Sequence, residues 1–411
     1  MDAPAADARP FPTRLFAFAF LGWTFDFYDL VLFGFIKDRV ARDLGLSHHL
    51  EPWLLGVALS TSGLGGIVGG RLADRFGKRS ILALTIGIYS LGSLVCGLAP
   101  TIETFIVGRA LVGLGVGGEW AIGHGMLAEA VAASRRGRAS ALLQSGEPVG
   151  VALAAVAGFV LVPHVGWRAV LVASSATALL AFVARRSLHL PSEVVARPAR
   201  FRELLTPGLP SRLLRGWLLG VFKLGTYWSC YTWLPTFLLT HMGQSTGKSL
   251  TWVITAQLGQ FSGMLTFGRI ADRFGRRIAF AGYSLLTAAA LAPLAFAWQT
   301  LAAHPLLFWG AMLLLGVGSG CTAGFGALLA ELFPTELRGL AMGSTYNLAR
   351  AAQLGAPVLV AWAVEEAGLA GGLGVPFVLA LLTASWVWTL PETRGIALPT
   401  LAGRELSAAE R

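Results

Sequence analysis

Charge and cysteine are both scarce in this sequence. Only 13% of its 411 residues are charged, and 55% are hydrophobic, with a mean hydropathy of +0.65. An average soluble domain carries roughly 25% charge, and no soluble core can bury this much apolar sequence without lipid outside it. The three cysteines lie far apart, which leaves no spacing for a disulfide framework or a metal site. We therefore expect a membrane protein with no soluble domain, no metal and no cofactor.

Apolar stretches long enough to cross a bilayer recur along the whole chain. A membrane helix needs about 20 such residues. The expected spans lie near residues 15–36, 53–73, 80–98, 103–129, 138–162, 167–185, 213–239, 250–271, 277–298, 305–330, 338–363 and 373–390. The predicted fold class is an all-α integral membrane protein with twelve transmembrane helices.

Positive charge is distributed unevenly over the loops between these spans. The net charge is +10; with the N-terminus placed in the cytoplasm, 24 of the 32 Lys and Arg residues fall on the cytoplasmic side, five in outer loops and three inside spans. Basic loops remain in the cytoplasm during insertion. We therefore expect a multi-pass protein of the cell (inner) membrane with both termini cytoplasmic. Because the charge sets topology, nucleic acid is not an expected partner.

The chain repeats itself at an offset of about 200 residues. "GGRLADRFGKRS" (69–80) returns as "FGRIADRFGRRI" (267–278), and "AEAVAASRRG" (128–137) is echoed by "AELFPTELRG" (330–339). Each repeat holds six of the expected spans. The predicted organisation is a six-helix N-terminal half (1–186), a polar and basic cytoplasmic connector (187–212) and a six-helix C-terminal half (213–411).

Several of these motifs resemble those of a known family. "GRLADRFGKR" between the second and third spans resembles the signature loop of the major facilitator superfamily, and "GRALVGLGVGG" is similar to its R-x-x-x-G-x-G-x-G pattern. "AELFPTELRG" and "LPETRG" resemble segments of its sugar-porter-like branches. "GVGGEW", together with a D-x-x-D pattern in the first span, is most similar to the metabolite:proton and sialate:proton symporter branches, which carry organic anions.

The resemblance implies two six-helix bundles around a central cavity. Transport would proceed by rocking of the two halves around a site near the membrane midplane. The sequence "SGEPVGVALA" in the fifth span has only part of the motif of drug/proton antiporters. This difference weakens an export function without excluding it.

Charged residues recur at the same place in both signature loops. The gating candidates are Asp74, Arg75 and Arg79 in the first loop and Asp272, Arg273 and Arg277 in the second. An aspartate there can accept hydrogen bonds from the unpaired N–H groups at a helix N-terminus. We expect a latch that holds one conformation and opens in the other. The alternative is that the arginines only fix the topology.

Polar residues also occur where the spans cross the middle of the bilayer. The midplane lies about ten residues from either end of a span, because a helix rises 1.5 Å per residue through a core about 30 Å thick. Counting from the ends places there Asp26, Asp29, Glu119, Gln144, Glu147, Lys223, Tyr227, Gln257, Gln260, Asn347 and Arg350, with Arg109 in the outer half. Spacings of three or four put the members of each pair on one helix face. Such residues usually face a functional cavity.

We assign roles to these residues by their charge. Lys223 and Arg350 are expected to bind a substrate carboxylate, which Arg can do in a bidentate fashion. The further substrate-binding candidates are Tyr227, Gln144, Gln257, Gln260 and Asn347. A coupled proton is expected on one of Asp26, Asp29, Glu119 and Glu147, because burial favours the protonated carboxyl group.

Each of these assignments has an alternative. For Arg109, the resemblance suggests a proton-relay role, and an ion pair with Glu119 or Asp29 is the other possibility. For every residue of this set, a structural ion pair between helices is the alternative to a functional role.

The sequence as a whole predicts a secondary active transporter that couples a proton to a small organic anion. Its partners would be that anion, the proton and the lipid bilayer, and it would work as a monomer. A sugar or drug transporter of the same fold and a non-transporting sensor are the alternatives. An enzyme is not expected, because no arrangement of nucleophile and base is visible.

Overall fold

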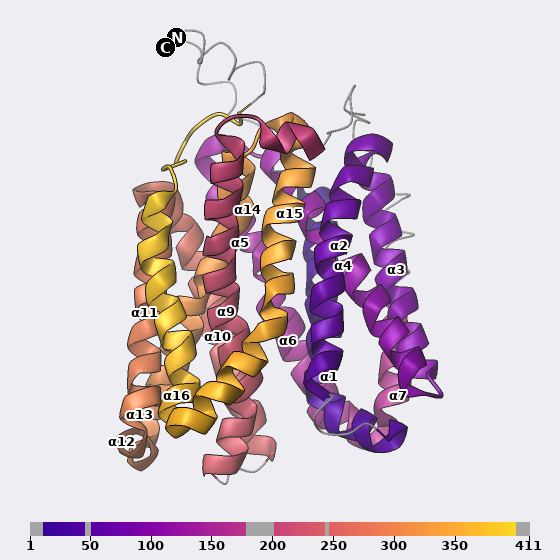
Figure 1. Ribbon diagram of the computed structural model, residues 1–411, viewed down its shortest axis with the longest axis vertical. Helices are drawn as coiled ribbons and strands as arrows, with labels where there is room; N and C mark the ends of the chain where they lie inside the picture. The colour runs from indigo at the N-terminus through magenta and orange to yellow at the C-terminus, as the bar shows by residue number, and fades with distance from the viewer. Residues whose placement is uncertain (1–10, 46–50, 178–200, 243–245, 400–411) are drawn as a thin grey trace.

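The computed structural model describes residues 11–45, 51–177, 201–242 and 246–399, and these residues form helices joined by short connections. The helices run side by side along the longest axis of the molecule, as Figure 1 shows. The fifth, tenth and eleventh predicted spans are each broken into shorter helices. The break in the fifth span positions two of the polar side chains described below, Gln144 and Glu147.

The first half of the chain begins with four long helices. They are α1 (Thr13–Leu44), α2 (Glu51–Phe76), α3 (Lys78–Leu98) and α4 (Ile102–Ala130). The fifth predicted span is broken into α5 (Arg136–Gln144), α6 (Gly146–Val156) and the π-helical turn η2 (Ala157–Leu161), after the short turn η1 (Ala133–Arg135). Then follow α7 (Val162–Ser174), which is kinked at Gly166, and η3 (Ser175–Thr177).

The second half follows the same plan. It contains η4 (Phe201–Leu205), α9 (Leu209–Met242), α10 (Thr246–Phe274), α11 (Arg276–Phe296) and α12 (Trp298–Ala303). The tenth span consists of α13 (Pro305–Ser319), η5 (Gly320–Ala323) and α14 (Gly324–Leu332). After η6 (Thr335–Leu337) come α15 (Arg338–Ala351), η7 (Ala352–Gly355), α16 (Ala356–Trp386) and η8 (Val387–Thr389). The backbone leaves helical geometry inside α16 at Ala367 and Gly368, so α16 spans the end of the eleventh predicted span and most of the twelfth.

The predicted fold class is confirmed. Each of the twelve expected spans coincides with helical backbone, the sixth through residue 177, after which residues 178–200 lie outside the described part. By length and hydropathy alone, seven stretches within the described ranges qualify as membrane spans. The twelve predicted spans are more numerous because they include helices with polar residues in their middles, such as Gln257 and Gln260 on α10.

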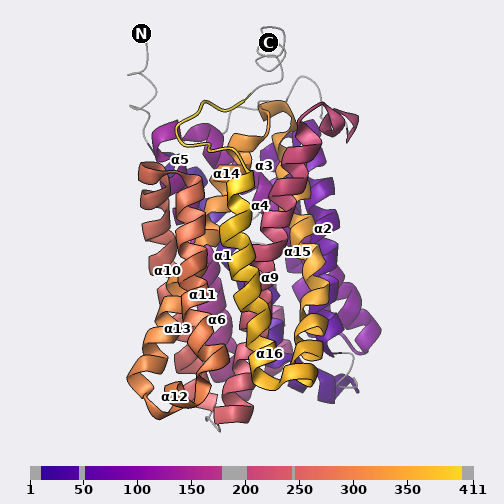
Figure 2. The ribbon, with the colours of Figure 1, turned by 60° about the vertical axis from the view of Figure 1, so that its left-hand side comes forward.

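The helices pack as two groups that meet along two seams. In the first half α4 packs between α2 and α3, and α1 packs on α6; in the second half α13 packs on α10, and α16 on α9 and α11. The seams between the halves are α2 against α15 and α5 against α10, and the α2–α15 seam is visible in both Figures 1 and 2. The domain boundaries stay a prediction, since residues 187–200 of the connector lie outside the described ranges.

Glycines allow the closest of these approaches. A methyl group added at Gly117 of α4 would overlap the Ser62 carbonyl oxygen on α2, and one at Gly343 of α15 would overlap the Gly66 carbonyl oxygen on α2. Small residues of this kind let two membrane helices pack backbone to backbone. α2 is therefore held tightly both to its own half and to the opposite one.

One end of the bundle carries most of the basic side chains, and we call it the basic end. Arg75, Lys78, Arg138, Arg273 and Arg394 lie there, at the ends of α2 and α10, the starts of α3 and α5, and the segment after η8. In Figure 1 this end is uppermost. The positive-inside rule predicts that it faces the cytoplasm.

Candidate functional site

A buried carboxylate, Glu147, lies between the two halves of the protein. The chain breaks at Ser145, and Glu147 stands in the first turn of α6 directly after the break. Gln144 donates its amide Nε2 to Glu147 Oε2 at 2.8 Å, and Gln260 of α10 donates its own to Oε1 at 2.8 Å. All three side chains are at most 2% exposed. The carboxylate is thus held by one amide from each half of the protein.

Gln144 is itself fixed by two further donors. Its Oε1 accepts from Trp120 Nε1 at 3.1 Å and lies 2.9 Å from His124 Nε2, so the ring nitrogen facing it is the protonated one. Trp120 stacks on Tyr346 of the other half, with the ring centroids 3.7 Å apart. Gln144 therefore links the carboxylate to an aromatic contact between the halves.

Two buried cations lie in the same layer. Arg350 of α15 and Lys223 of α9 are each 1% exposed, and both are charged neighbours of Glu147. The Arg350 guanidinium packs over the rings of Trp23 at 5.4 Å and Tyr346 at 5.2 Å. Its two terminal nitrogens, and Lys223 Nζ, have no carboxylate within hydrogen-bond distance among the described residues. Buried cations without a paired anion are costly, and a bound anion would satisfy them.

The remaining predicted substrate residues are also buried in this layer. Gln257 of α10 is 3% exposed and neither atom of its amide has a hydrogen-bond partner within the described ranges. Asn347 donates to the Gly117 carbonyl oxygen of α4 at 2.9 Å, and so joins the seam between α15 and α4. Tyr227 of α9 is buried, with its ring edge-on to Trp228. The layer is drawn from α4, α5, α6, α9, α10 and α15.

The predicted proton-coupling residues of α1 and α4 form a second group within the first half. Ser93 of α3 donates to Asp29 Oδ2. Arg109 of α4 donates to the backbone carbonyl oxygens of Asp29 and Leu30 at 3.3 Å each, and its guanidinium lies over the Phe33 ring. Arg109 therefore sits beside Asp29 but does not form a salt bridge with its carboxylate.

Asp26 and Glu119 are the other two acids of this second group. A methyl group added at Gly22, one turn before Asp26, would overlap the Glu119 carboxylate, so Glu119 packs directly on α1. The charged neighbours of Asp26 are Glu119, Arg350 and Asp29. All four oxygens of Asp26 and Glu119 are buried, and the two carboxyl groups are hydrogen-bonded to each other. Asp26 is thus the acid that connects this second group to Arg350.

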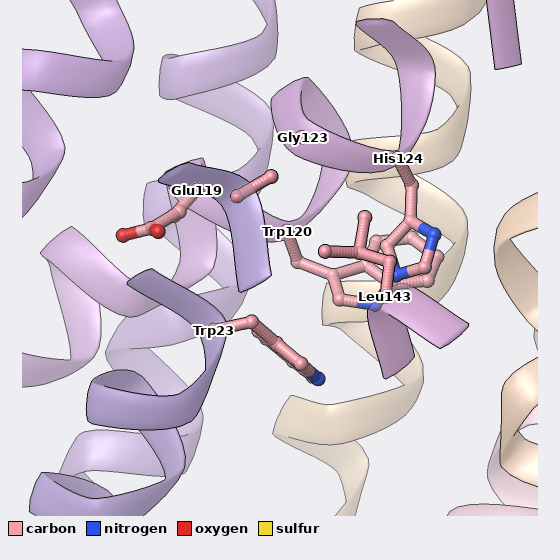
Figure 3. Close-up of a pocket in the computed structure, with 7 residues that line it drawn as sticks. Trp23, Glu119, Trp120, Gly123, His124 and Leu143 are labelled. Carbon is pink, nitrogen blue, oxygen red and sulfur yellow. The ribbon is translucent and has the colours of Figure 1, made fainter. Parts of the chain in front are cut away.

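A small cavity lies beside these acids. It measures about 10 Å³ and is lined by residues of α1, α4 and α5, including Trp23, Glu119 and His124. In Figure 3 Glu119 points away from Trp120 and His124, although all three belong to α4. A volume near 10–15 Å³ holds a single water molecule. α4 therefore presents one polar face to the seam between the halves and another to α1.

Sequence reasoning missed several residues of these groups. Tyr346 stands one turn before Arg350 on α15, and Ser93 lies on α3, which carries no charged residue in its middle. A search for polar side chains one helical turn from each predicted charge finds Tyr346. No comparable signal marks Ser93, because hydroxyl residues are common in helices and satisfy themselves on the preceding turn.

At the basic end, one predicted gating residue joins the two halves. Asp272 of α10 accepts from the backbone N–H groups of Gly137 and Arg138, at the start of α5, at 3.0 Å each. It also pairs with Arg276 at 2.8 Å. The carboxylate therefore caps a helix of the opposite half, where the helix dipole favours a negative charge. The side chain of Asp74, its counterpart in the first half, lies outside the described residues.

A second carboxylate, Glu392, holds the end of the chain to α11. It accepts from the backbone N–H groups of Arg276 at 2.9 Å and Arg277 at 3.1 Å, and from those of Thr393 and Arg394. Burial alone raises the pKa of the Glu392 carboxyl, but these four hydrogen bonds outweigh it and hold the pKa below its ordinary value. The contact is therefore intact at neutral pH and weakens only when the pH falls through that lowered pKa.

Among the described side chains of the other gating candidates, none forms a hydrogen bond or ion pair between the halves; Arg277 donates its Nε to the Leu390 carbonyl oxygen of its own half. Arg75 and Arg273 are exposed and lie over the rings of their neighbours Phe76 and Phe274. Arg79 is half-buried. Arg276, which was not a candidate, pairs with Glu331 at 2.9 Å, as does Arg136 of α5 at 3.4 Å. Glu331 therefore pairs with one arginine from each half. It is a second carboxylate, besides Asp272, that joins the halves at the basic end.

Replacing Asp272 with asparagine is expected to leave membrane insertion intact and to slow transport several-fold. The amide keeps the size of the side chain but loses the charge that favours the α5 N-terminus and Arg276, an effect of about 1 kcal/mol or more. The transport rate of purified protein in liposomes measures this, with Arg273→Gln as a control at the exposed neighbouring position. An unchanged rate in Asp272→Asn would contradict the latch.

Two repeated helical halves, enclosing a polar layer with buried cations and acids, are the architecture of a membrane transporter. The sequence model of the Major Facilitator Superfamily matches residues 15–256 and 239–408. The chain therefore belongs to this superfamily, and it is a multi-pass membrane transporter rather than an enzyme.

Curated relatives cover nearly the whole chain. A Cupriavidus pinatubonensis protein named for 4-methylmuconolactone transport is 30% identical over 413 residues, which is 95% of this chain and 93% of that protein. The niacin transporter NiaP of Acinetobacter baylyi is 26% identical over 418 residues, covering 93% and 94% of the two chains. The sialic acid transporter NanX of Escherichia coli is 28% identical over 389 residues, 93% of each chain. The predicted resemblance to the metabolite and sialate branches is confirmed.

A solved structure shares the fold. That of the proton:xylose symporter XylE bound to 6-bromo-6-deoxy-D-glucose superimposes with a TM-score of 0.76, covering 97% of this chain and 99% of that one at 19% identity. At this identity the likeness concerns the fold alone. The substrate of this chain must be argued from its own residues.

Proposed function

We propose that this transporter carries a small organic anion, a carboxylate, together with a proton by alternating access. The observation that carries the proposal is the pair of buried cations, Arg350 and Lys223, whose terminal nitrogens have no carboxylate within hydrogen-bond distance among the described side chains. A guanidinium offers two parallel N–H donors to a carboxylate, and an ammonium adds a second positive charge. A neutral sugar would not satisfy either charge.

The charges of the layer suggest how a proton is coupled to the anion. Asp26 and Glu119 are buried carboxyl groups with Arg350 as the neighbouring cation of Asp26. Two carboxyl groups buried together do not both ionise, so one proton is shared between them and the remaining negative charge balances Arg350. When the pair takes up a second proton, Arg350 loses its balancing charge. The substrate carboxylate then supplies the negative charge that balances Arg350. One proton therefore enters with each substrate carboxylate.

The surroundings of Arg350 favour a planar acid. Trp23, Phe27 and Tyr346 all lie within 6 Å of its guanidinium, measured to the ring centroids. Aromatic faces offer stacking to an aromatic or conjugated ring. The niacin and 4-methylmuconolactone named for two of the relatives are small ring compounds, which agrees with this substrate class.

Alternating access would use the seams already described. The halves meet along α2–α15 and α5–α10, and at the basic end through Asp272 and Glu331. Opening at the basic end requires these contacts to separate, while Glu147 and Gln260 exchange their hydrogen bond for substrate or water. We place the basic end in the cytoplasm, both termini in the cytoplasm and the protein in the inner membrane as a monomer.

Uptake into proteoliposomes tests the proposal. Liposomes containing the purified protein receive an imposed pH gradient, and small aromatic carboxylates, dicarboxylates, amino acids and sugars are compared. We expect accumulation of a carboxylate only when the outside is more acidic. Accumulation that ignores the pH gradient would contradict proton coupling, and accumulation of a neutral sugar alone would contradict the anion.

A further inference from the structure

Two uncharged residues of α3, Tyr89 and Ser93, face the acids of α1 and α4. Tyr89 is completely buried, and Thr177 of η3 is the hydroxyl residue beside its own hydroxyl group. The charged groups that act on it are Glu119, Asp26 and Asp29. Ser93 donates to Asp29, as described above. A hydroxyl group both donates and accepts a hydrogen bond, so contact with Thr177 leaves it able to bond to a carboxyl group as well. Its position among three carboxyl groups needs an explanation.

The helix register places these groups in one column. The Ser93–Asp29 hydrogen bond fixes α3 against α1, and both helices start at the basic end. Tyr89 stands four residues before Ser93, and Asp26 three before Asp29, which are shifts of about 6 and 4.5 Å toward the basic end. Tyr89 is therefore level with Asp26.

α4 closes the other side of the column. A methyl group added at Gly115 would overlap the Tyr89 backbone, so α4 and α3 are in direct contact at this level. Glu119, one turn further along α4, lies nearer the basic end, and Arg109 lies on the opposite side beside Asp29. From the basic end the order is Glu119, then Asp26 with Tyr89, then Asp29 with Ser93, then Arg109.

We infer that Tyr89 is a proton-relay residue between Asp29 and the Asp26–Glu119 pair, and that Ser93 positions Asp29 for this transfer. The inference rests on the proposed proton symport and adds a route for the proton. This route lies inside the N-terminal half, between α1, α3 and α4, and is separate from the Glu147–Gln260 contact between the halves.

The transfer needs no other reactant. A protonated carboxyl group at one level donates its proton to the oxygen of Tyr89, whose own hydroxyl proton passes to the ionised carboxylate at the next level. One O–H bond breaks and one forms at the tyrosine, which is left unchanged. Ser93 occupies Oδ2 of Asp29 and leaves Oδ1, which has no partner within the described residues, as the oxygen that exchanges the proton. The other polar groups around these residues are Arg109, Cys96 and Tyr28 near Asp29, and Thr177 near Tyr89.

Comparing uptake driven by a pH gradient with exchange at equal pH tests the relay. Exchange of labelled for unlabelled carboxylate across the liposome membrane needs no net proton movement. For Tyr89→Phe we expect driven uptake to fall at least tenfold, with exchange within twofold of the unmodified protein. For Ser93→Ala we expect the pH profile of uptake to move to higher pH, because the ionised Asp29 has lost a donor.

The equivalent helix of the second half provides matched controls. Tyr283 and Ser284 of α11 are buried, and their hydroxyl groups contact Thr266 at 2.6 Å and Cys321 at 3.8 Å, away from the acids. Tyr283→Phe and Ser284→Ala are expected to behave like the unmodified protein in both assays. A Tyr89→Phe variant that resembles these controls, or that loses driven uptake and exchange equally, would overturn the relay. An unmodified protein that shows no pH-driven uptake would instead overturn the proposed symport and the relay together.

Discussion

Replacing Arg350 with glutamine is expected to lower kcat/KM for uptake of the organic anion by 100-fold or more. Arg350 is a buried cation whose two terminal nitrogens meet no carboxylate in the described part of the chain, and three aromatic rings surround it. Glutamine removes the charge and the bidentate donor pair, and loss of one partner of a buried charge pair costs about 3–5 kcal/mol. Because each 1.4 kcal/mol is a factor of ten, the expected loss is between about 100-fold and about 4,000-fold.

Three further variants make the Arg350 result specific. Arg350→Lys keeps the charge but loses the planar fork, so it should recover only part of the activity. Lys223→Gln should raise the KM for the anion as well, by a smaller factor. Arg168→Gln changes an arginine that lies over the Trp167 ring at 4.3 Å and donates to the Ala99 carbonyl oxygen. It lies remote from the polar layer, and uptake should be unaffected. Normal anion uptake in both Arg350→Gln and Lys223→Gln would contradict the assignment.

Replacing Asp26 with asparagine is expected to abolish accumulation driven by the pH gradient while preserving exchange. Asparagine is neutral at every pH, so it can no longer supply the charge that balances Arg350 when the proton leaves. The anion then binds whether or not a proton has bound. Internal substrate should therefore rise only to the external concentration, and uptake should lose its dependence on pH.

Measurements of accumulation and exchange in the same liposome preparation separate uncoupling from misfolding. Asp43→Asn is the matched control on α1, because Asp43 lies near the far end of the helix, where it accepts from Trp167 Nε1 at 2.7 Å. It should accumulate substrate normally. If Asp26→Asn still accumulates substrate against its gradient, Asp29, Glu119 or Glu147 carries the coupled proton instead. Asp29→Asn, Glu119→Gln and Glu147→Gln in the same assay would then identify it.

The sequence predicted the polar layer best for charged and amide residues whose depth in the membrane could be counted from the ends of a span. Counting residues from the ends of the spans placed Glu147, Gln260 and Arg350 at one level, and in the structure they share one buried layer. The repeat of the signature loop predicted the role of Asp272 at a helix N-terminus, because the location of a carboxylate next to basic residues follows from local chemistry. The fold class followed from hydropathy and the two repeats.

Contacts between helices that are distant in the sequence were beyond this reasoning. The stacking of Trp120 on Tyr346 depends on how α4 and α15 pack across the seam, which no pattern within either helix specifies. The breaks at Ser145 and in η5 were not predicted either, since hydropathy treats a span as continuous. It is the break at Ser145 that brings Gln144 and Glu147 into hydrogen-bond contact, and this geometry appears only in the folded chain.

The cap that Asp272 forms on α5 makes hydrogen exchange at two backbone amides sensitive to whether the basic end is open or closed. The amide hydrogens of Gly137 and Arg138 are bonded to a carboxylate from the opposite half, so they are shielded only while the halves meet at the basic end. Separation of the halves would expose both to solvent without unfolding either bundle. The rate at which these two backbone amides take up deuterium therefore measures how often the halves separate at the basic end. A substrate that favours the closed orientation should slow that exchange, and one that drives the cycle forward should speed it.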